Sequence, residues 1–247
     1  MQSGEGDMSE RRGFEQMWLA KLSGCLDEVA GEEIRKQVMA GSEALASDAS
    51  TPAVIQWTRE AMERLEALVG EERSRRVMMG CACQYPKADL QEIKRMVQAT
   101  GDLNLAHRML QERFETFLRD TLRLSDELVA DVVQRGWGVA GVRDRSTIVA
   151  TKIPKSGTLV EYMHETDPEK RRQYYCHCPR VREVLKGAET IPVVYCYCGA
   201  GFYKGIWEEI LQEPVKVEVL ESVLRGDDVC TFAIYLPYER RIHDHPD

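Results

Sequence analysis

Six of the eight cysteines stand in three Cys-x-Cys pairs, and this spacing is the clearest chemical feature of the sequence. The pairs are Cys81 with Cys83, Cys176 with Cys178, and Cys196 with Cys198. Scattered core cysteines would not pair in this way, so the pattern indicates metal binding or redox chemistry. The first ten residues are polar and lack the apolar segment of a signal peptide. We therefore expect a cytoplasmic protein, in which structural disulfides are rare.

Two of these pairs are expected to lie where helices begin. Pro179 favours the first position of a helix, which puts Cys178 just before it. Cys198 precedes a predicted helix over about residues 199–212. Helix N-termini carry free N–H groups and a partial positive charge, and both stabilise a thiolate. Cys176, Cys178, Cys196 and Cys198 therefore predict a tetrahedral zinc site of four sulfurs.

The third pair lies in a predicted loop between helices and would bring Cys81 and Cys83 to the same site. Cys-x-Cys is tighter than the common zinc spacing, although in an extended strand both side chains share a face. An iron–sulfur cluster also needs about four cysteines, but the spacings differ from ferredoxin runs, so it ranks below zinc. A dithiol redox site and a set of buried, inert cysteines remain alternatives. His177 would point away from its two neighbours in an extended segment.

Outside the pairs, the sequence offers little chemistry. We predict that Cys25 and Cys230 are core residues, because each lies on an apolar face. No phosphate-binding loop, nucleophile elbow or zinc-protease helix is present. Glu208, Glu209 and Glu221 could serve as acids or bases, and a solvated helix face or strand edge is the favoured interpretation.

The helices and strands that the sequence pattern predicts around these residues indicate an α+β fold. Apolar residues recur at helical spacing through residues 13–135, with one helix stopped by Gly70, one over 87–100 and one capped by Ser125. Residues 136–239 read as an α+β, cysteine-rich part. A hairpin is predicted from 147–154 and 158–161, and a second from the strands around 215–219 and 230–236. Residues 1–12 and 240–247 are expected to be flexible.

The segment 195–236 resembles the tail of the 4-vinyl reductase domain superfamily. The resemblance lies in Gly201-x-x-x-Gly205 on a helix, Gly226-Asp227-Asp228, and Cys230-x-Phe232. It implies an antiparallel sheet with a packing helix, and a small-molecule pocket between them. The whole chain is similar to an uncharacterised family of cysteine-rich prokaryotic proteins, and distantly to L-2-amino-thiazoline-4-carboxylic acid hydrolase-like proteins.

We therefore expect a small-molecule-binding or sensor protein with a zinc site built from the cysteine pairs. A metal-dependent hydrolase of a small ring or amide is one alternative, and an iron–sulfur or dithiol redox protein is another. The net charge of −8 argues against nucleic acid as a main partner. No apolar run is long enough to cross a membrane. Met78-Met79 and the aromatic residues allow a homodimer interface.

Overall fold

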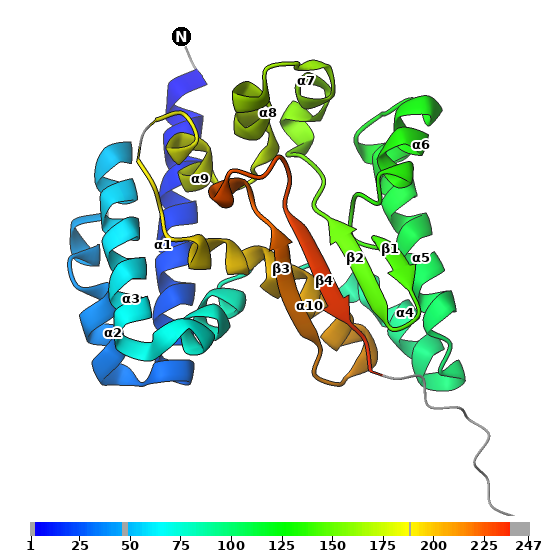
Figure 1. Cartoon of the computed structure of the whole chain (residues 1–247), viewed down its shortest axis with the longest axis horizontal. Coiled ribbons are helices and arrows are strands. Elements are labelled where there is room, and N and C mark those ends of the chain that lie inside the picture. Colours follow the sequence, from blue (N-terminus) through cyan, green and yellow to red (C-terminus); the bar gives the residue numbers. More distant parts are fainter. Residues whose placement is uncertain (1–2, 46–48, 188, 238–247) are drawn as a thin grey trace, which may run out of the picture. The chain divides into compact units, whose positions relative to one another are not determined.

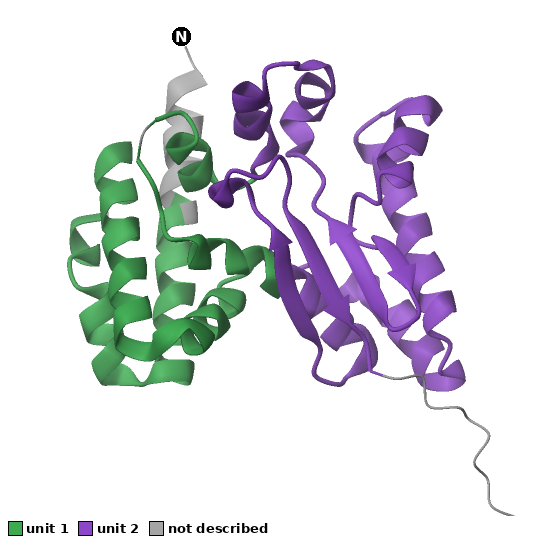
Figure 2. Ribbon diagram, viewed as in Figure 1, with its two compact units in different colours: residues 1–82, 177–201 green, residues 83–176, 202–247 purple. Residues whose placement is uncertain are grey.

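A computed structural model describes residues 3–45, 49–187 and 189–237, without the side chains of residues 3–12 and 14 (Figure 1). The chain forms two compact units, and each is built from separate stretches of sequence (Figure 2). Unit 1 holds residues 1–82 and 177–201, and unit 2 holds residues 83–176 and 202–247. Each unit is described separately below.

Unit 1 is helical. Its elements are α1 (Ser3–Ala30), α2 (Glu32–Met39), the 3-10 helix η1 (Ser42–Leu45), α3 (Thr51–Gly80), α9 (Pro179–Val184), the 3-10 helix η4 (Val193–Cys196) and the first turn of α10 (Tyr197–Leu211). Helix α1 packs against α2 and α3, and α3 also contacts α9 and η4. Leu22, Leu26, Met62 and Leu65 are fully buried in this core. Helix α1 begins at Ser3, inside the segment 1–12 for which the sequence predicts flexibility.

Unit 2 contains a four-stranded antiparallel sheet in the order β1-β2-β4-β3. Its elements are α4 (Lys87–Thr100), α5 (Leu103–Thr116), the π-helix η2 (Phe117–Thr121), α6 (Asp126–Gln134), β1 (Val142–Asp144), β2 (Thr147–Thr151), the 3-10 helix η3 (Ser156–Thr158), α7 (Leu159–His164), α8 (Pro168–Tyr175), the rest of α10, β3 (Lys216–Glu221), the 3-10 helix η5 (Val223–Arg225) and β4 (Thr231–Tyr235). The α10 residue Tyr203 packs on Phe232 of β4, with ring centroids 5.0 Å apart. The α+β prediction is confirmed.

Several predicted boundaries are confirmed by the cap geometry. Helix α4 ends at Gly101, whose φ of 67° is the left-handed conformation that glycine adopts readily. The Ser125 side chain accepts a hydrogen bond from the Leu128 N–H and caps α6. Cys178 is the N-cap residue of α9, with Pro179 following it. Strands β3 and β4 pair as expected.

One predicted helix boundary is wrong. Gly70 does not end the helix; it kinks α3 with φ 74° and ψ 173°, and the helix resumes to Gly80. It resumes because Ser74, Val77 and Met78 are buried at helical spacing. Met78 is buried in this structure, and the homodimer that the sequence allows stays a prediction.

The predicted hairpin across residues 155–157 does not form. Strand β2 instead pairs with β1 and β4, and its turn to β1 includes Arg145, with φ 54°. Residues 156–164 are helical, and Leu159 and Tyr162 are buried three residues apart, on one helix face. That spacing outweighed the β-branched composition of the segment. Among the described residues, no helix is both long and apolar enough to span a membrane.

Candidate functional site

The site begins with a contact between two thiols in unit 1. The Cys81 thiol, at the C-terminal end of α3, is hydrogen-bonded to the sulfur of Cys25 on α1. The Cys81 sulfur also lies 3.3 Å from the Val77 carbonyl oxygen, an alternative acceptor for its proton. A Cβ atom on Gly80 would lie 2.6 Å from the Cys25 Sγ, closer than side chains tolerate. A glycine at this position therefore lets the two sulfurs meet.

This contact shifts the pKa values of the two thiols in opposite directions. The hydrogen bond from Cys81 lowers the pKa of Cys25 to about 7; burial and Glu28 oppose this effect, and Lys21 adds to it. The same hydrogen bond, together with burial, raises the pKa of Cys81 far above its ordinary value. Cys25 is half-buried, while Cys81 is only 3% exposed. At neutral pH the pair therefore combines a partly exposed, half-ionised thiol with a buried, protonated one.

The start of α10 packs closely against the end of α3. A Cβ atom on Gly201 would lie 2.0 Å from the carbonyl oxygen of Met79, so the absence of a side chain is required for this close packing. The contact holds the first turn of α10, with Cys198 on it, against the end of α3. After the hydrogen bond to Cys25 and burial, Cys198 adds a smaller electrostatic contribution to the raised pKa of Cys81.

A buried tyrosine extends the cluster to Cys178. The hydroxyl oxygen of Tyr195 lies 3.2 Å from the Cys178 Sγ and 3.5 Å from a guanidinium nitrogen of Arg180. Burial raises the pKa of Tyr195; the neighbouring Cys178 and Cys198 add to this effect, and Arg180 opposes it. Cys25 contacts Cys81, Cys178 contacts Tyr195, and Cys198 acts electrostatically on both Cys81 and Tyr195. We refer to these four cysteines as the thiol cluster.

Arg180 anchors the outer side of this cluster. It is 2% exposed, forms an ion pair with Glu15 and stacks over the Trp18 ring at 3.8 Å. Burial opposes its charge, but the neighbouring Tyr195 and Glu15 more than offset this, and the pKa of Arg180 is raised. A buried, permanently charged guanidinium group therefore lies beside the Tyr195 hydroxyl.

The six predicted metal ligands divide between the units. Cys81, Cys178, Cys196 and Cys198 belong to unit 1, whereas Cys83 and Cys176 belong to unit 2. Cys176 and Cys178 have the expected extended backbone. Cys196 and Cys198 instead lie where a 3-10 helix passes into α10, and residues two apart in a helix do not face each other. Across the described part of the chain, no three His, Cys, Asp or Glu side chains are already grouped as metal ligands would be.

The sequence prediction for Cys25 needs correction. Its apolar-stripe position suggested a core cysteine, but it is half-buried and its sulfur contacts another thiol. The signal that could have found it is Gly80-Cys81, a glycine beside a cysteine at the end of a helix. Cys230 is buried, as predicted, and burial raises the pKa of its thiol.

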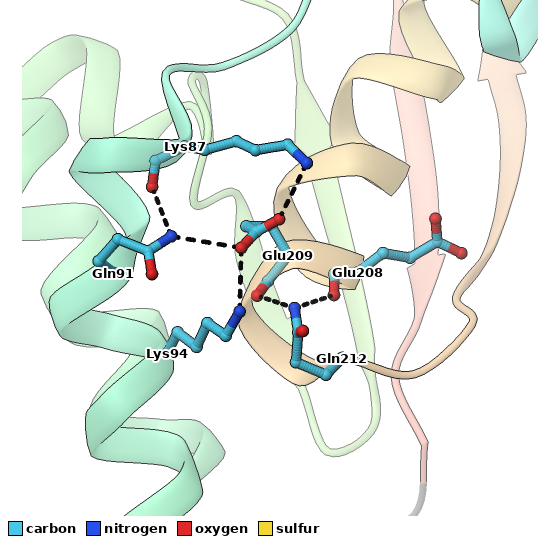
Figure 3. Close-up of polar contacts among 6 residues, drawn as sticks. All are labelled: Lys87, Gln91, Lys94, Glu208, Glu209 and Gln212. Atoms are coloured by element: carbon cyan, nitrogen blue, oxygen red, sulfur yellow. Dashed lines mark hydrogen bonds and ion pairs between the residues drawn. The ribbon is translucent and has the colours of Figure 1, made fainter.

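The carboxylates of Glu208 and Glu209 on α10 form structural contacts within unit 2. Glu209 accepts hydrogen bonds from Gln91 and Lys94 and pairs with Lys87, so it ties α10 to α4 within unit 2 (Figure 3). Its side chain is only 14% exposed, so the prediction of a solvated helix face is wrong for this residue. Glu208 accepts a hydrogen bond from the Val215 N–H.

Comparison with known proteins adds one match. Residues 159–240 are similar to a family of unknown function, DUF6144. The matched segment is less than half of the 247 residues; it includes Cys176, Cys178, Cys196 and Cys198. Neither a curated protein nor a solved structure matches the chain at a significant level. The family description assigns no chemistry, so the site has to be interpreted from its own residues.

Proposed function

We propose that this chain is a thiolate metal-binding protein, and that unit 1 binds one zinc ion through Cys81, Cys178 and Cys198. The observation that carries this proposal is the position of Cys198. Its charge acts on both Cys81 and Tyr195, and Tyr195 in turn contacts Cys178. Cys81, Cys178 and Cys198 come from three different elements of one compact unit, and in this proposal the bound ion draws their sulfurs together.

A fourth sulfur would complete the site, and two candidates are present in unit 1. Cys25 already contacts Cys81, and Cys196 is joined to Cys198 by a single intervening residue. Zinc with four sulfur ligands is tetrahedral and closed, which is a structural rather than a hydrolytic arrangement. This chemistry favours the binding or sensor role over the metal-dependent hydrolase. Tyr195 would serve as an outer partner that orients Cys178 through its hydroxyl group.

The surroundings suit a charged zinc–thiolate centre. Four thiolates around Zn²⁺ carry a net negative charge, which needs nearby cations and hydrogen-bond donors. Arg180 and Lys21 both stand beside these cysteines: Arg180 through Tyr195, and Lys21 through its charge effect on Cys25 and Cys81. Because zinc displaces protons from thiols, binding should strengthen as pH rises.

We also propose that the chain binds a small molecule, and this second proposal rests on a residue of unit 2. Trp207 of α10 is fully buried, and its indole N–H has no hydrogen-bond partner among the described residues. Buried donors are nearly always satisfied, so a ligand carrying an acceptor atom would supply the missing partner. The test is mass spectrometry of molecules released when the purified chain is denatured. A molecule retained by the wild type but lost from Trp207→Phe would support the idea, and a wild type that retains no molecule would refute it.

The zinc proposal is tested by the metal content of single variants purified without oxygen. Cys198→Ser should lose most of its zinc, because the substitution removes one of the three proposed ligands. Cys230→Ser is the matched control, since this buried cysteine belongs to unit 2 and should leave the zinc content unchanged.

The same assay identifies the fourth ligand. Cys25→Ser and Cys196→Ser should differ, and the variant with the lower zinc content names the residue. Equal zinc content in wild type, Cys198→Ser and Cys178→Ser would refute the ligand assignment. Circular dichroism on each variant separates loss of metal from loss of fold.

A further inference from the structure

The contact between Cys25 and Cys81 supports a second activity. Their sulfurs are hydrogen-bonded to each other across α1 and the end of α3. Gly80 supplies the space for this approach, because a Cβ at that position would overlap the Cys25 sulfur. Two thiols in direct contact need only a small movement to reach the short sulfur–sulfur distance of a disulfide.

The two sulfurs also differ in access. Cys25 is half-buried and can meet a small molecule from solvent, whereas Cys81 is 3% exposed. A dithiol with one accessible and one buried sulfur has a natural order of reaction: the accessible sulfur attacks first, and the buried one resolves the product. We propose that Cys25 and Cys81 form a dithiol that exchanges with low-molecular-weight disulfides, with Cys25 as the attacking residue and Cys81 as the resolving residue.

The exchange balances without any further reactant. The Cys25 thiolate attacks one sulfur of a small disulfide RSSR, which forms the Cys25–S–S–R bond and releases RS⁻. The Cys81 thiol then gives up its proton to that thiolate or to water and attacks the Cys25 sulfur. The Cys25–Cys81 bond forms, and the second RS⁻ leaves and is protonated. Two protein thiols are oxidised, and one small disulfide is reduced to two thiols.

This activity does not depend on zinc. Where zinc is bound, its bond to Cys81 occupies the resolving sulfur, so the ion should slow the exchange. Without zinc, the pair is available as the structure shows it. A failure to bind zinc therefore leaves the exchange proposal intact, and a failure of exchange leaves the zinc proposal intact.

The test uses the full chain with a zinc chelator and oxidised glutathione as the probe. After reaction, the remaining thiols are alkylated and the disulfides are mapped by mass spectrometry. The expected product links the tryptic peptide 22–35, which contains Cys25, to the peptide 77–87, which contains Cys81. The second peptide also contains the exposed Cys83, so a Cys83→Ser variant should give the same link.

Two variants assign the roles. Cys81→Ser should stop at a stable glutathione adduct on Cys25, because no resolving thiol remains. Cys25→Ser should lose the internal disulfide and leave Cys81 unmodified, because this sulfur is buried. A link from Cys25 to Cys83 would overturn the proposal, as would wild-type protein that keeps a glutathione adduct on Cys25. The wild-type map decides the matter even where a variant does not fold.

Discussion

The acidity of Cys25 depends on its neighbour, and substituting that neighbour gives a quantitative prediction. The hydrogen bond from Cys81 is the largest influence on Cys25 and lowers its pKa from an ordinary 9.0 to about 7. Cys81→Ala removes the donor and leaves the smaller, mutually opposing effects of burial, Glu28 and Lys21. The pKa of Cys25 should then return toward 9. Cys81→Ser keeps a hydroxyl donor and should leave the pKa near that of the wild type.

The rate of alkylation follows from this shift. At pH 7 the thiolate fraction falls from roughly one half to about 1%, a loss of about 50-fold. A more basic thiolate is also a better nucleophile, and a Brønsted slope of about 0.4–0.5 returns roughly 6- to 10-fold over two pKa units. The net expectation is Cys25 alkylation about 5- to 8-fold slower at pH 7 in Cys81→Ala. Above about pH 10, where both are ionised, the variant should be about 6- to 10-fold faster.

The assay is iodoacetamide labelling from pH 5.5 to 10.5 in the presence of a zinc chelator. Mass spectrometry reads the modification of the peptide that carries Cys25, so the other cysteines do not interfere. The wild-type rate should rise through a midpoint near pH 7 and then level off. Coincident profiles for wild type and Cys81→Ala would refute the role assigned to the hydrogen bond, as would a wild-type midpoint near pH 9.

Four further substitutions test the packing and the ion pairs. Gly201→Ala should lower the free energy of unfolding in urea by about 1–3 kcal/mol, because its Cβ would overlap a backbone carbonyl. Gly205→Ala meets nothing within 4 Å and should be neutral or stabilising by up to about 1 kcal/mol; equal effects would contradict this reasoning. Glu15→Gln leaves the buried charge of Arg180 without its carboxylate and should cost about 3–5 kcal/mol, and a loss below 1 kcal/mol would speak against it. The hydrogen bond from Lys94 is the largest of the interactions that lower the pKa of Glu209 from its ordinary value of 4.5. The stability that ionised Glu209 adds is therefore fully present above pH 4.5 and is lost as the pH falls through the lowered pKa. Urea titrations of Glu209→Gln should therefore approach those of the wild type in acid, and a constant difference would count against the ion pairs.

Local signals in the sequence predicted the local structure well. Gly101 ends α4 and Ser125 caps α6, because cap residues act within a single turn. The alternation around Val217 and Val219 identified β3, since one face of that strand is buried. Gly70 misled the prediction, because burial of the following turns outweighs the cost of one kinked residue.

The site was only partly predictable, because its contacts join residues far apart in the sequence. The pairing of cysteines indicated thiol chemistry, and the proline after Cys178 gave its position at a helix start. Periodicity alone made Cys25 a core residue, since a stripe of apolar positions does not reveal which neighbour each side chain meets. The same limit applies to Glu209. Its spacing placed it on a helix face that was predicted to be solvated, but the spacing does not reveal that Lys94 of α4 lies beside it.

The closeness of Gly201 to α3 shows why one glycine of a Gly-x-x-x-Gly pattern can matter more than the other. Gly201 faces a backbone carbonyl, whereas Gly205 faces open space. Spacing within the sequence treats the two positions alike. Only the tertiary contact distinguishes the glycine that holds α10, with Cys198, beside the end of α3.

The zinc stoichiometry of the anaerobically purified, untagged chain tests the central proposal most directly. Elemental analysis should find about one zinc per chain, and labelling of the native protein should show Cys178 and Cys198 protected until a chelator is added. Zinc well below one equivalent after reconstitution, with Cys178 and Cys198 labelled equally with and without chelator, would contradict the account.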